Sequence, residues 1–575
     1  MSTDTFEANS VLGIDIGSIN TRALLFDVVE NSYHFIASGA APSTHTEPYF
    51  DIGQGVFDSI TRLQESTGRM LLDNEGNLLI PSRVGGEGVD RFVVTVSCTT
   101  FLKIVTFGLL NDVSLDSVNK LAYSIHGKVV ESIGINDRRP LHAQLDAVLA
   151  ANPDLILFAG GTEGGASRSI LRMSSLIANI LEILPAPQRP RILYCGNSKL
   201  GKRLSDGFSR LTQVKLTRNI HPTIDDEVLE PALKDLDEMV MDMQQAKLGG
   251  LDRMAPLCST PPILSSQGFH NVVRFLGKQY DPAKGVFAVD IGGTHSVAAY
   301  ANHDVSNLHT FSYGLGSGIS SIADKTSIKD LMMWLDGSRS EEEVMDYLWQ
   351  RSLYPNSIAT NKTDLDLELA ATRHILRLIM RDLELRNALP TNRFEPILIS
   401  GSALNRTVTP LQSLLVILDG IQPLGICPMI LDKHGMLGIL GAAGRLDPLL
   451  PVQVLESTAF TNLATVINAV SNAKPGSAIM QARLVYANGS YLDAEIKQGS
   501  ILSLPLASGE TGELQLKMLR RTVIEDVNIS NEPILVRGGV CGVVIDARGR
   551  PLQLPEQAEK RRELFHNWEF MLGGK

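Results

Sequence analysis

The stretch VLGIDIGSINTRALLFDV, residues 11–28, opens the fold of this chain. Val11–Gly17 is an apolar run, Ser18–Asn20 is a short polar turn, and Thr21–Val28 is a second apolar run, followed by a third at Tyr33–Gly39. Short runs of aliphatic and β-branched residues separated by polar turns predict consecutive strands. The stretch therefore predicts an antiparallel β-meander.

The same pattern returns 275 residues later, counted from Asp15 to Asp290. Its parts are an apolar run at Val286–Asp290, a turn at Gly292 and Gly293, and further runs at Ser296–Asn302 and Leu308–Tyr313. An internal repeat of this kind constrains the whole architecture. We therefore expect a duplicated α/β fold with two similar lobes.

Other parts of the chain have different patterns. Between Leu115 and Leu248, buried strands alternate with amphipathic helices, which is typical of a parallel α/β layer. After Pro451 we expect a helix at Thr461–Ser471 and then, over Ser477–Leu554, short strands and turns. The expected units are a first lobe over residues 1–112, an inserted α/β region over 113–250, a second lobe over 251–450 and a β-rich domain over 451–575.

Composition narrows the functional classes. The chain has 575 residues, of which 44% are hydrophobic and 20% charged, with a net charge of −11. This is ordinary for a globular protein, and the acidic balance gives no general attraction to nucleic acid or anionic lipid. The five cysteines lack zinc-binding spacing, and neither a leader nor an unbroken membrane span is evident. We expect a cytoplasmic protein that binds neither nucleic acid nor membrane; homo-oligomerisation stays open.

The first hairpin carries side chains suited to a metal and a phosphate. The Asp15 carboxylate can hold Mg²⁺, directly or through water, and Gly17 lets backbone N–H groups approach a phosphate. Ser18, Asn20 and Thr21 add hydroxyl and amide groups. An aspartate and a glycine that only shape a β-turn are the alternative reading.

The second hairpin repeats this chemistry with Asp290, Gly292, Gly293 and Thr294. Two such hairpins, one opening each half of the chain, indicate a clamp for a polyphosphate and its metal between two lobes. A later buried strand runs into the small residues Gly401 and Ser402, where a nucleobase or ribose could approach the backbone; a plain strand-to-helix connection is the alternative. Asp15 and Asp290 are the expected metal ligands.

This ordered set of motifs resembles the superfamily of actin, sugar kinases and heat-shock-chaperone ATPases, whose ribonuclease H-like lobes enclose a nucleotide. Within it, the chain is similar to the MutL-type family of activator or repair proteins of cobalamin-dependent glutamate mutase. The closer match rests on Asp15–Ser18 with Thr21, Ser97-Cys98, Leu155–Gly165, Tyr194–Ser198, Asp290–Gly293 and Gly438–Gly444.

The resemblance implies a chaperone-like reactivase that binds ATP or ADP with Mg²⁺ and acts on a cobalamin-dependent mutase subunit. It implies catalytic roles for Asp15 and Asp290, with Glu163 positioning the attacking water. The loop Ala159-Gly-Gly-Thr-Glu-Gly-Gly165 ends a buried strand and precedes a helix, so Gly160, Gly161 and Thr162 could receive an anion. A plain βα loop is the alternative for this segment.

One departure from the family pattern concerns catalysis. His295, Ser296 and Val297 stand where the family usually continues with a threonine pair and then an aspartate. The missing acid at Val297 counts against efficient hydrolysis more than against nucleotide binding. Slow Mg²⁺-dependent ATP hydrolysis, an actin-like scaffold with little turnover, and a small-molecule kinase of the same fold therefore remain alternatives.

Overall fold

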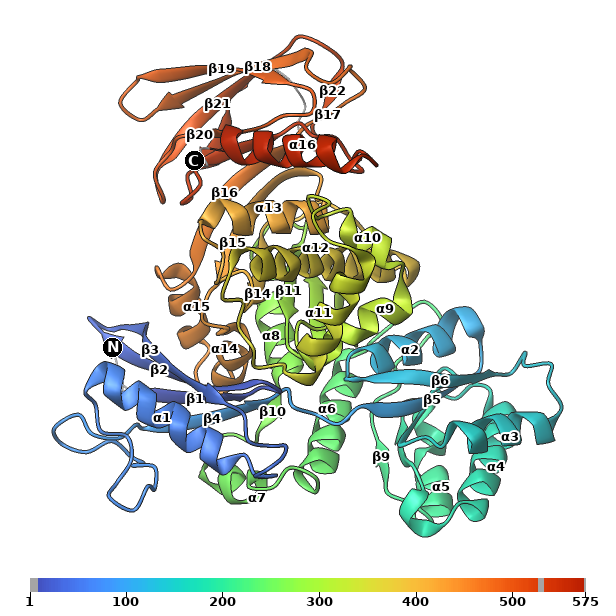
Figure 1. Ribbon diagram of the computed structural model, residues 1–575. Coiled ribbons are helices and arrows are strands. Elements are labelled where there is room, and N and C mark those ends of the chain that lie inside the picture. Colours follow the sequence, from blue (N-terminus) through green and yellow to red (C-terminus); the bar gives the residue numbers. More distant parts are fainter. Residues whose placement is uncertain (1–8, 526–531, 573–575) are drawn as a thin grey trace, which may run out of the picture.

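The computed structural model describes residues 9–525 and 532–572. Figure 1 shows the first lobe and the inserted region beside each other, the second lobe against both, and the C-terminal strands at the far end of the second lobe. Within the described residues, no helix combines the length and apolar character needed to cross a membrane.

The first lobe is built on the predicted meander. Its sheet has the order β10-β4-β1-β2-β3, with β1 antiparallel to β2 and parallel to β4. Helix α1 (Gly53–Thr67) packs against β2 and β3. The strands are β1 (Val11–Ile16), β2 (Asn20–Val29), β3 (Ser32–Pro42), β4 (Arg91–Val96) and β10 (Ile263–Leu264).

The second lobe repeats this order. Its sheet begins β13-β12-β11-β14-β15, again an antiparallel meander followed by two parallel strands. The predicted duplication is therefore confirmed. The elements are β11 (Val286–Ile291), β12 (Ser296–Ala301), β13 (Ser306–Phe311), β14 (Ile397–Gly401) and β15 (Gly425–Asp432), with helices α9 (Ser321–Lys325), α10 (Ile328–Met332), α11 (Glu341–Leu353), α12 (Lys362–Leu385) and α13 (Pro410–Ile421).

Two helices cross where the lobes meet. Helix α8 (Ser265–Gly277) packs against α14 (Leu437–Ala443), and both helices contact strand β4 of the first lobe. A methyl group on Gly441 would overlap the carbonyl oxygen of Gly268, so the helix backbones touch directly. Helices α7 (Leu251–Met254) and α15 (Leu449–Glu456) lie on either side of this pair in the sequence.

The inserted region forms the expected parallel layer, with the strand order β6-β5-β7-β8-β9 and its own apolar core. Its first strand, β5, begins at Leu102, ahead of residue 113. The elements are β5 (Leu102–Gly108), β6 (Gly127–Gly134), β7 (Leu155–Phe158), β8 (Arg191–Tyr194) and β9 (Val214–Leu216), with helices α2 (Asp116–Tyr123), α3 (Leu141–Ala151), α4 (Ser167–Ile183), α5 (Ser198–Phe208) and α6 (Glu230–Gln245).

The C-terminal residues extend the second lobe's sheet. Strand β16 (Thr461–Asn468) pairs with β15, and the sheet continues through β24 (Val543–Asp546) to β20 (Ile501–Leu504). The helix expected at Thr461–Ser471 is therefore wrong: its β-branched residues pair with an open sheet edge. The other elements are β17 (Val470–Ser471), β18 (Ala478–Tyr486), β19 (Tyr491–Lys497), β21 (Thr511–Met518), β22 (Thr522–Val523), β23 (Ile534–Arg537) and α16 (Ala558–Met571).

Candidate functional site

A cleft between the two lobes brings both predicted hairpins together. Its lining includes Asp15, Gly17, Ser18 and Asn20 of the first hairpin, Asp290, Gly292 and Gly293 of the second, and Ser402 after β14. The two aspartates, 275 residues apart in sequence, thus face one space.

Asp15 is held in place by hydroxyl groups. Its Oδ1 accepts hydrogen bonds from Thr95 Oγ1 at 2.9 Å and Ser265 Oγ at 2.7 Å. Arg22 lies opposite Asp15 in the β1–β2 pair, and its Nη1 is 3.6 Å from Oδ2. One carboxylate oxygen is therefore engaged in positioning the group, and among the described residues the other is paired with the more distant guanidinium.

A second acidic group lies where three parallel strands end. Asp290 of β11 is beside Ser400 of β14, which is beside Asp432 of β15. Asp432 is 1% exposed and accepts the N–H groups of His434 at 3.2 Å and Leu437 at 3.0 Å. Burial raises the pKa of Asp290. It also raises the pKa of Asp432 to about 6, an effect to which the charge of Asp290 adds.

Sequence reasoning missed Asp432, although it lines the same cleft as Asp15 and Asp290. A signal was present, because Met429–Asp432 is an apolar run that ends on a carboxylate, as the first strand of each hairpin does. The run lacks the glycine turn that marks the hairpins. Only the pairing of β14 with β15 shows that it ends at the cleft.

The hairpin turns are closed by glycine. A Cβ atom on Gly17 or Gly292 would lie 2.5 Å from the carbonyl oxygen three residues later. A side chain would not fit these narrow turns, which present backbone groups to the cleft. Across the cleft, Ile19 lies so close to Gly293 that a Cβ there would overlap its side chain. The tips of the two hairpins are therefore in contact.

Two of the expected phosphate contacts point elsewhere. Thr21 is 1% exposed, and its Oγ1 lies 2.9 Å from Ser43 Oγ. Thr294 Oγ1 lies 2.8 Å from Ser317 Oγ. Neither threonine is among the described residues that line the cleft. Each hydroxyl could still make a further hydrogen bond, so it is the position of these side chains outside the cleft lining that separates them from a ligand there.

The two hairpins differ opposite their aspartates. Arg22 pairs with Asp15, whereas Val297 pairs with Asp290, and both side chains line the cleft. The first hairpin therefore contributes a guanidinium and the second only methyl groups. Val297, the position at which the family pattern has an aspartate, therefore lies directly beside Asp290.

The turn after β14 meets a buried ion cluster. Gly401 has a φ of +152°, and Ser402 follows it at the cleft. Glu368, 1% exposed, pairs through one oxygen with Arg351 Nη2 at 3.1 Å and with Arg406. Both arginines line the cleft, although sequence reasoning did not select them. Since they come from separate segments, no local pattern marks them.

The glycine-rich loop 160–165 is not part of this cleft. It follows β7 in the inserted region, and none of its residues is among the described lining residues. Glu163 accepts hydrogen bonds from Ser198 N at 3.2 Å and Asn219 Nδ2 at 3.0 Å. Although burial opposes the shift, these partners lower the pKa of Glu163. The Glu163 carboxylate thus accepts a hydrogen bond at the start of α5 and lies apart from Asp15 and Asp290. Gly160, Gly161 and Thr162 of the same loop are likewise outside the described lining of the cleft.

His295 links the second hairpin to the inserted region. It is 8% exposed, and its ring stacks on that of His126, with ring centroids 4.4 Å apart. Burial, aided by His126, lowers the pKa of His295 to about 3, so the ring is neutral near pH 7. Thr310 Oγ1 donates to the carbonyl oxygen of Ile125 at 2.5 Å. The inserted region therefore rests directly on the second lobe.

The donor set of the cleft suits Mg²⁺. Carboxylate oxygens are the hard ligands that Mg²⁺ prefers, and this ion usually keeps several waters while binding one or two carboxylates and substrate phosphates. Within residues 9–525 and 532–572, no three acidic, histidine or cysteine side chains come close enough to enclose a metal by themselves. Asp15 and Asp290 therefore fit a water- and phosphate-completed Mg²⁺ site.

Comparisons with known proteins find a matching family model and a similar protein. A family model described as MutL protein matches residues 11–459. Protein MutL of Clostridium tetanomorphum is 22% identical over 220 residues, which are 36% of this chain and 45% of that protein. The aligned region thus spans less than half of that relative.

Solved structures of other proteins are also similar to this chain. A xylulose kinase from Bifidobacterium adolescentis is 13% identical, with 77% of this chain and 93% of that chain covered and a TM-score of 0.28. A glycerol dehydratase reactivase is 10% identical, with 76% and 100% covered and a TM-score of 0.31.

Proposed function

The chain belongs to the MutL protein family, and from this premise we propose that it is an ATP-dependent activator of a cobalamin-dependent mutase of the glutamate mutase type. The observation that carries the proposal is the convergence of Asp15 and Asp290, from two repeated hairpins, in one cleft between the lobes. Such a cleft suits a nucleoside polyphosphate, because each hairpin offers a carboxylate and a glycine turn.

The proposed roles follow from the cleft. Asp15 and Asp290 hold Mg²⁺ through water, with Asp432 as a third acidic neighbour. The turns at Gly17 and Gly292–Gly293 present backbone groups to the phosphates. When bound, Mg²⁺ neutralises phosphate charge and orients the chain of phosphates.

The adenosine end lies near Ser402. Ser402 lines the cleft, whereas the neighbouring Gly401 is buried against Ile291 and is not a described lining residue. The guanidinium groups of Arg351 and Arg406 border the space at Ser402. The buried Glu368 orients both arginines. They are candidates for contacts with the ribose or base rather than for catalysis.

Turnover is expected to be slow. Val297 occupies the position beside Asp290, where a carboxylate could otherwise position or activate water. Glu163 lies outside the cleft lining and offers no replacement. The same observation favours the second candidate, an actin-like scaffold that binds nucleotide with little hydrolysis.

In this proposal, the activator works by changing how the two lobes are arranged relative to each other. A ligand held between two lobes favours the arrangement to which it binds more tightly. The lobes meet at the α8–α14 crossing, where Gly268 and Gly441 bring the backbones together. Nucleotide exchange would then alternate two lobe arrangements and remodel a bound mutase.

Calorimetric titration with ATP and ADP in the presence of Mg²⁺ tests the cleft. Asp15→Asn and Asp290→Asn should each weaken binding at least tenfold, whereas Asp146→Asn, an exposed change on α3, should leave it unchanged. Absence of nucleotide binding by the natural chain, or full affinity in both cleft variants, would refute the assignment.

A second assay separates activator from scaffold. Phosphate release is measured with and without a cobalamin-dependent mutase, together with recovery of mutase activity after its cofactor has been damaged. Stimulated release and recovered activity support the activator. Nucleotide binding without either result supports the scaffold.

A further inference from the structure

A second cavity, of about 740 Å³, lies between the second lobe and the C-terminal residues. This volume is within the range of small-molecule sites. Its walls come from α10, α12, the end of α13 and the segment 550–554. The apolar part of the lining includes Trp334, Leu378, Leu552 and Leu554.

One face of α12 supplies the polar wall. His374, Arg377 and Arg381 are three and four residues apart, a spacing that aligns side chains along a helix, and all line the cavity. Within the described chain, Arg377 has no hydrogen bond or ion pair, and the one ion pair of Arg381 is to its neighbour Asp382 at 3.5 Å. His374 is 5% exposed, and its buried Nε2 lacks a partner.

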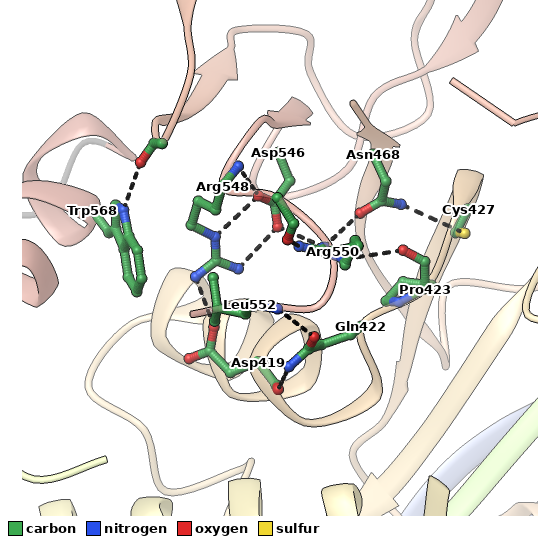
Figure 2. Close-up of polar contacts among 12 residues, drawn as sticks. Asp419, Gln422, Pro423, Cys427, Asn468, Asp546, Arg548, Arg550, Leu552 and Trp568 are labelled. Carbon is green, nitrogen blue, oxygen red and sulfur yellow. Dashed lines mark hydrogen bonds and ion pairs between the residues drawn. The ribbon is translucent and has the colours of Figure 1, made fainter. Parts of the chain in front are cut away.

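The adjoining ion network cannot supply the missing anion. Figure 2 shows Asp546 between Arg548 and Arg550, and Asp419 beside Arg548. Asp419 also pairs with Arg373 at 2.8 Å. Three guanidinium groups therefore share two carboxylates, and Arg377 gains only a longer-range attraction from Asp419 without a direct pair among the described residues.

The other charges around the cavity do not balance Arg377 either. Arg550 lines the cavity but already donates to Asn468 and Asp546, each at 2.8 Å. Asp330 and Glu384 are both exposed, where water and salt screen their charges. Arg377 is partly buried, and burial lowers its pKa although the charges of Asp419, Asp330 and Glu384 oppose that shift.

We propose that this cavity binds a small organic anion, with its carboxylate or phosphate group on Arg377 and Arg381 and its apolar body against Trp334 and Leu552. Guanidinium groups suit both oxyanions because they donate paired, parallel hydrogen bonds. His374 Nε2 adds one further polar contact. The site shares no lining residue with the cleft between the lobes.

A ligand in this cavity would lie at the junction between the second lobe and the C-terminal residues. The cavity wall at Leu552 is joined to Gln422, the residue directly after α13, by the hydrogen bond from Leu552 N to Gln422 Oε1, 2.8 Å long (Figure 2). A bound anion would therefore contact both the second lobe and the C-terminal segment. It would strengthen the junction between them.

Crystals of the full chain soaked in tungstate, a phosphate mimic with strong anomalous scattering, locate the oxyanion directly. Calorimetry with inorganic phosphate and, in a separate arm, benzoate distinguishes a phosphate from an aromatic carboxylate. Mg-ADP is present throughout to occupy the other cleft. We expect tungstate between α12 and residues 550–554, and measurable binding of at least one of the two anions.

Arg377→Gln should weaken that binding at least tenfold, whereas Arg168→Gln, an exposed change on α4, should not alter it. If Arg377→Gln fails to fold, the exposed Arg381→Gln serves the same test. No tungstate in this cavity, no binding in either arm, or undiminished affinity in the folded α12 variant would overturn the proposal.

Discussion

Replacing Asp546 by alanine should destabilise the junction between the second lobe and the C-terminal strands by several kcal/mol. Asp546 is 1% exposed and accepts four hydrogen bonds: from N, Nε and Nη2 of Arg548 at 3.0, 3.0 and 2.9 Å, and from Nη2 of Arg550 at 2.8 Å. Its removal leaves Arg548 with Asp419 alone and Arg550 without a carboxylate (Figure 2).

The magnitude follows from the burial of the remaining cations. Removing one partner of a buried ion pair costs about 3–5 kcal/mol, because the other charge stays desolvated. A typical domain is stable by about 5–15 kcal/mol, so the loss is a large share of the total. Asp493→Ala is a matched control, since Asp493 also accepts two bonds from one arginine, Arg483, at 2.7 and 2.9 Å, but on the exposed surface. Water can replace that partner.

Calorimetric unfolding and limited proteolysis measure the effect. Asp546→Ala should lower the temperature of the transition that includes the C-terminal strands and expose residues 461–572 to protease. Asp493→Ala should match the natural chain in both assays. An unchanged transition and an unchanged cleavage rate in Asp546→Ala would refute the view that this network clamps the junction.

Two further predictions concern the contact of α6 with the first lobe's sheet and the α8–α14 crossing. Burial raises the pKa of Asp237 to about 7, from an ordinary value of 3.8, while its Oδ1 accepts Leu264 N at 3.0 Å. The folded chain therefore retains a proton that the unfolded chain loses, and stability falls as the pH rises from about 4 to 7. Asp237→Asn should remove this decline and stabilise the protein at pH 8 by up to about 4 kcal/mol; parallel pH curves for both proteins would contradict it. Gly441→Ala should destabilise the α8–α14 crossing by about 1–3 kcal/mol in denaturant unfolding, because its methyl group meets the Gly268 carbonyl. Gly207→Ala, in an open helical position, should be neutral or stabilising, and equal effects of the two changes would argue against a tight crossing.

The local sequence pattern was sufficient to predict the duplicated lobes and the family. Asp15 and Asp290 each end an apolar strand before a glycine turn, and this geometry is determined by residues adjacent in sequence. The resemblance to the MutL-type family is confirmed by the match over residues 11–459. The α/β class with an inserted parallel layer is confirmed as well.

Features that depend on tertiary pairing were not predictable in this way. Asp432 reaches the cleft only because β15 adjoins β14, and Arg351 and Arg406 meet only through Glu368. A glycine-rich βα loop has the same sequence pattern whether or not it faces a nucleotide, so Glu163 could not be placed from its neighbours. The segment 461–471 became a strand because an open sheet edge was available to it.

The continuous sheet of the second lobe connects the cleft to the C-terminal strands. From β11, which carries Asp290, the sheet runs through β14, β15, β16 and β24 to β20. At about 4.8 Å between strands, β20 lies roughly 24 Å from β11 at the cleft between the lobes. A rotation of about 15°, a size known from allosteric proteins, would carry this far edge through roughly 6 Å. Because hydrogen bonds join every strand along the way, a rigid rotation of this sheet at the cleft would also displace the C-terminal strands.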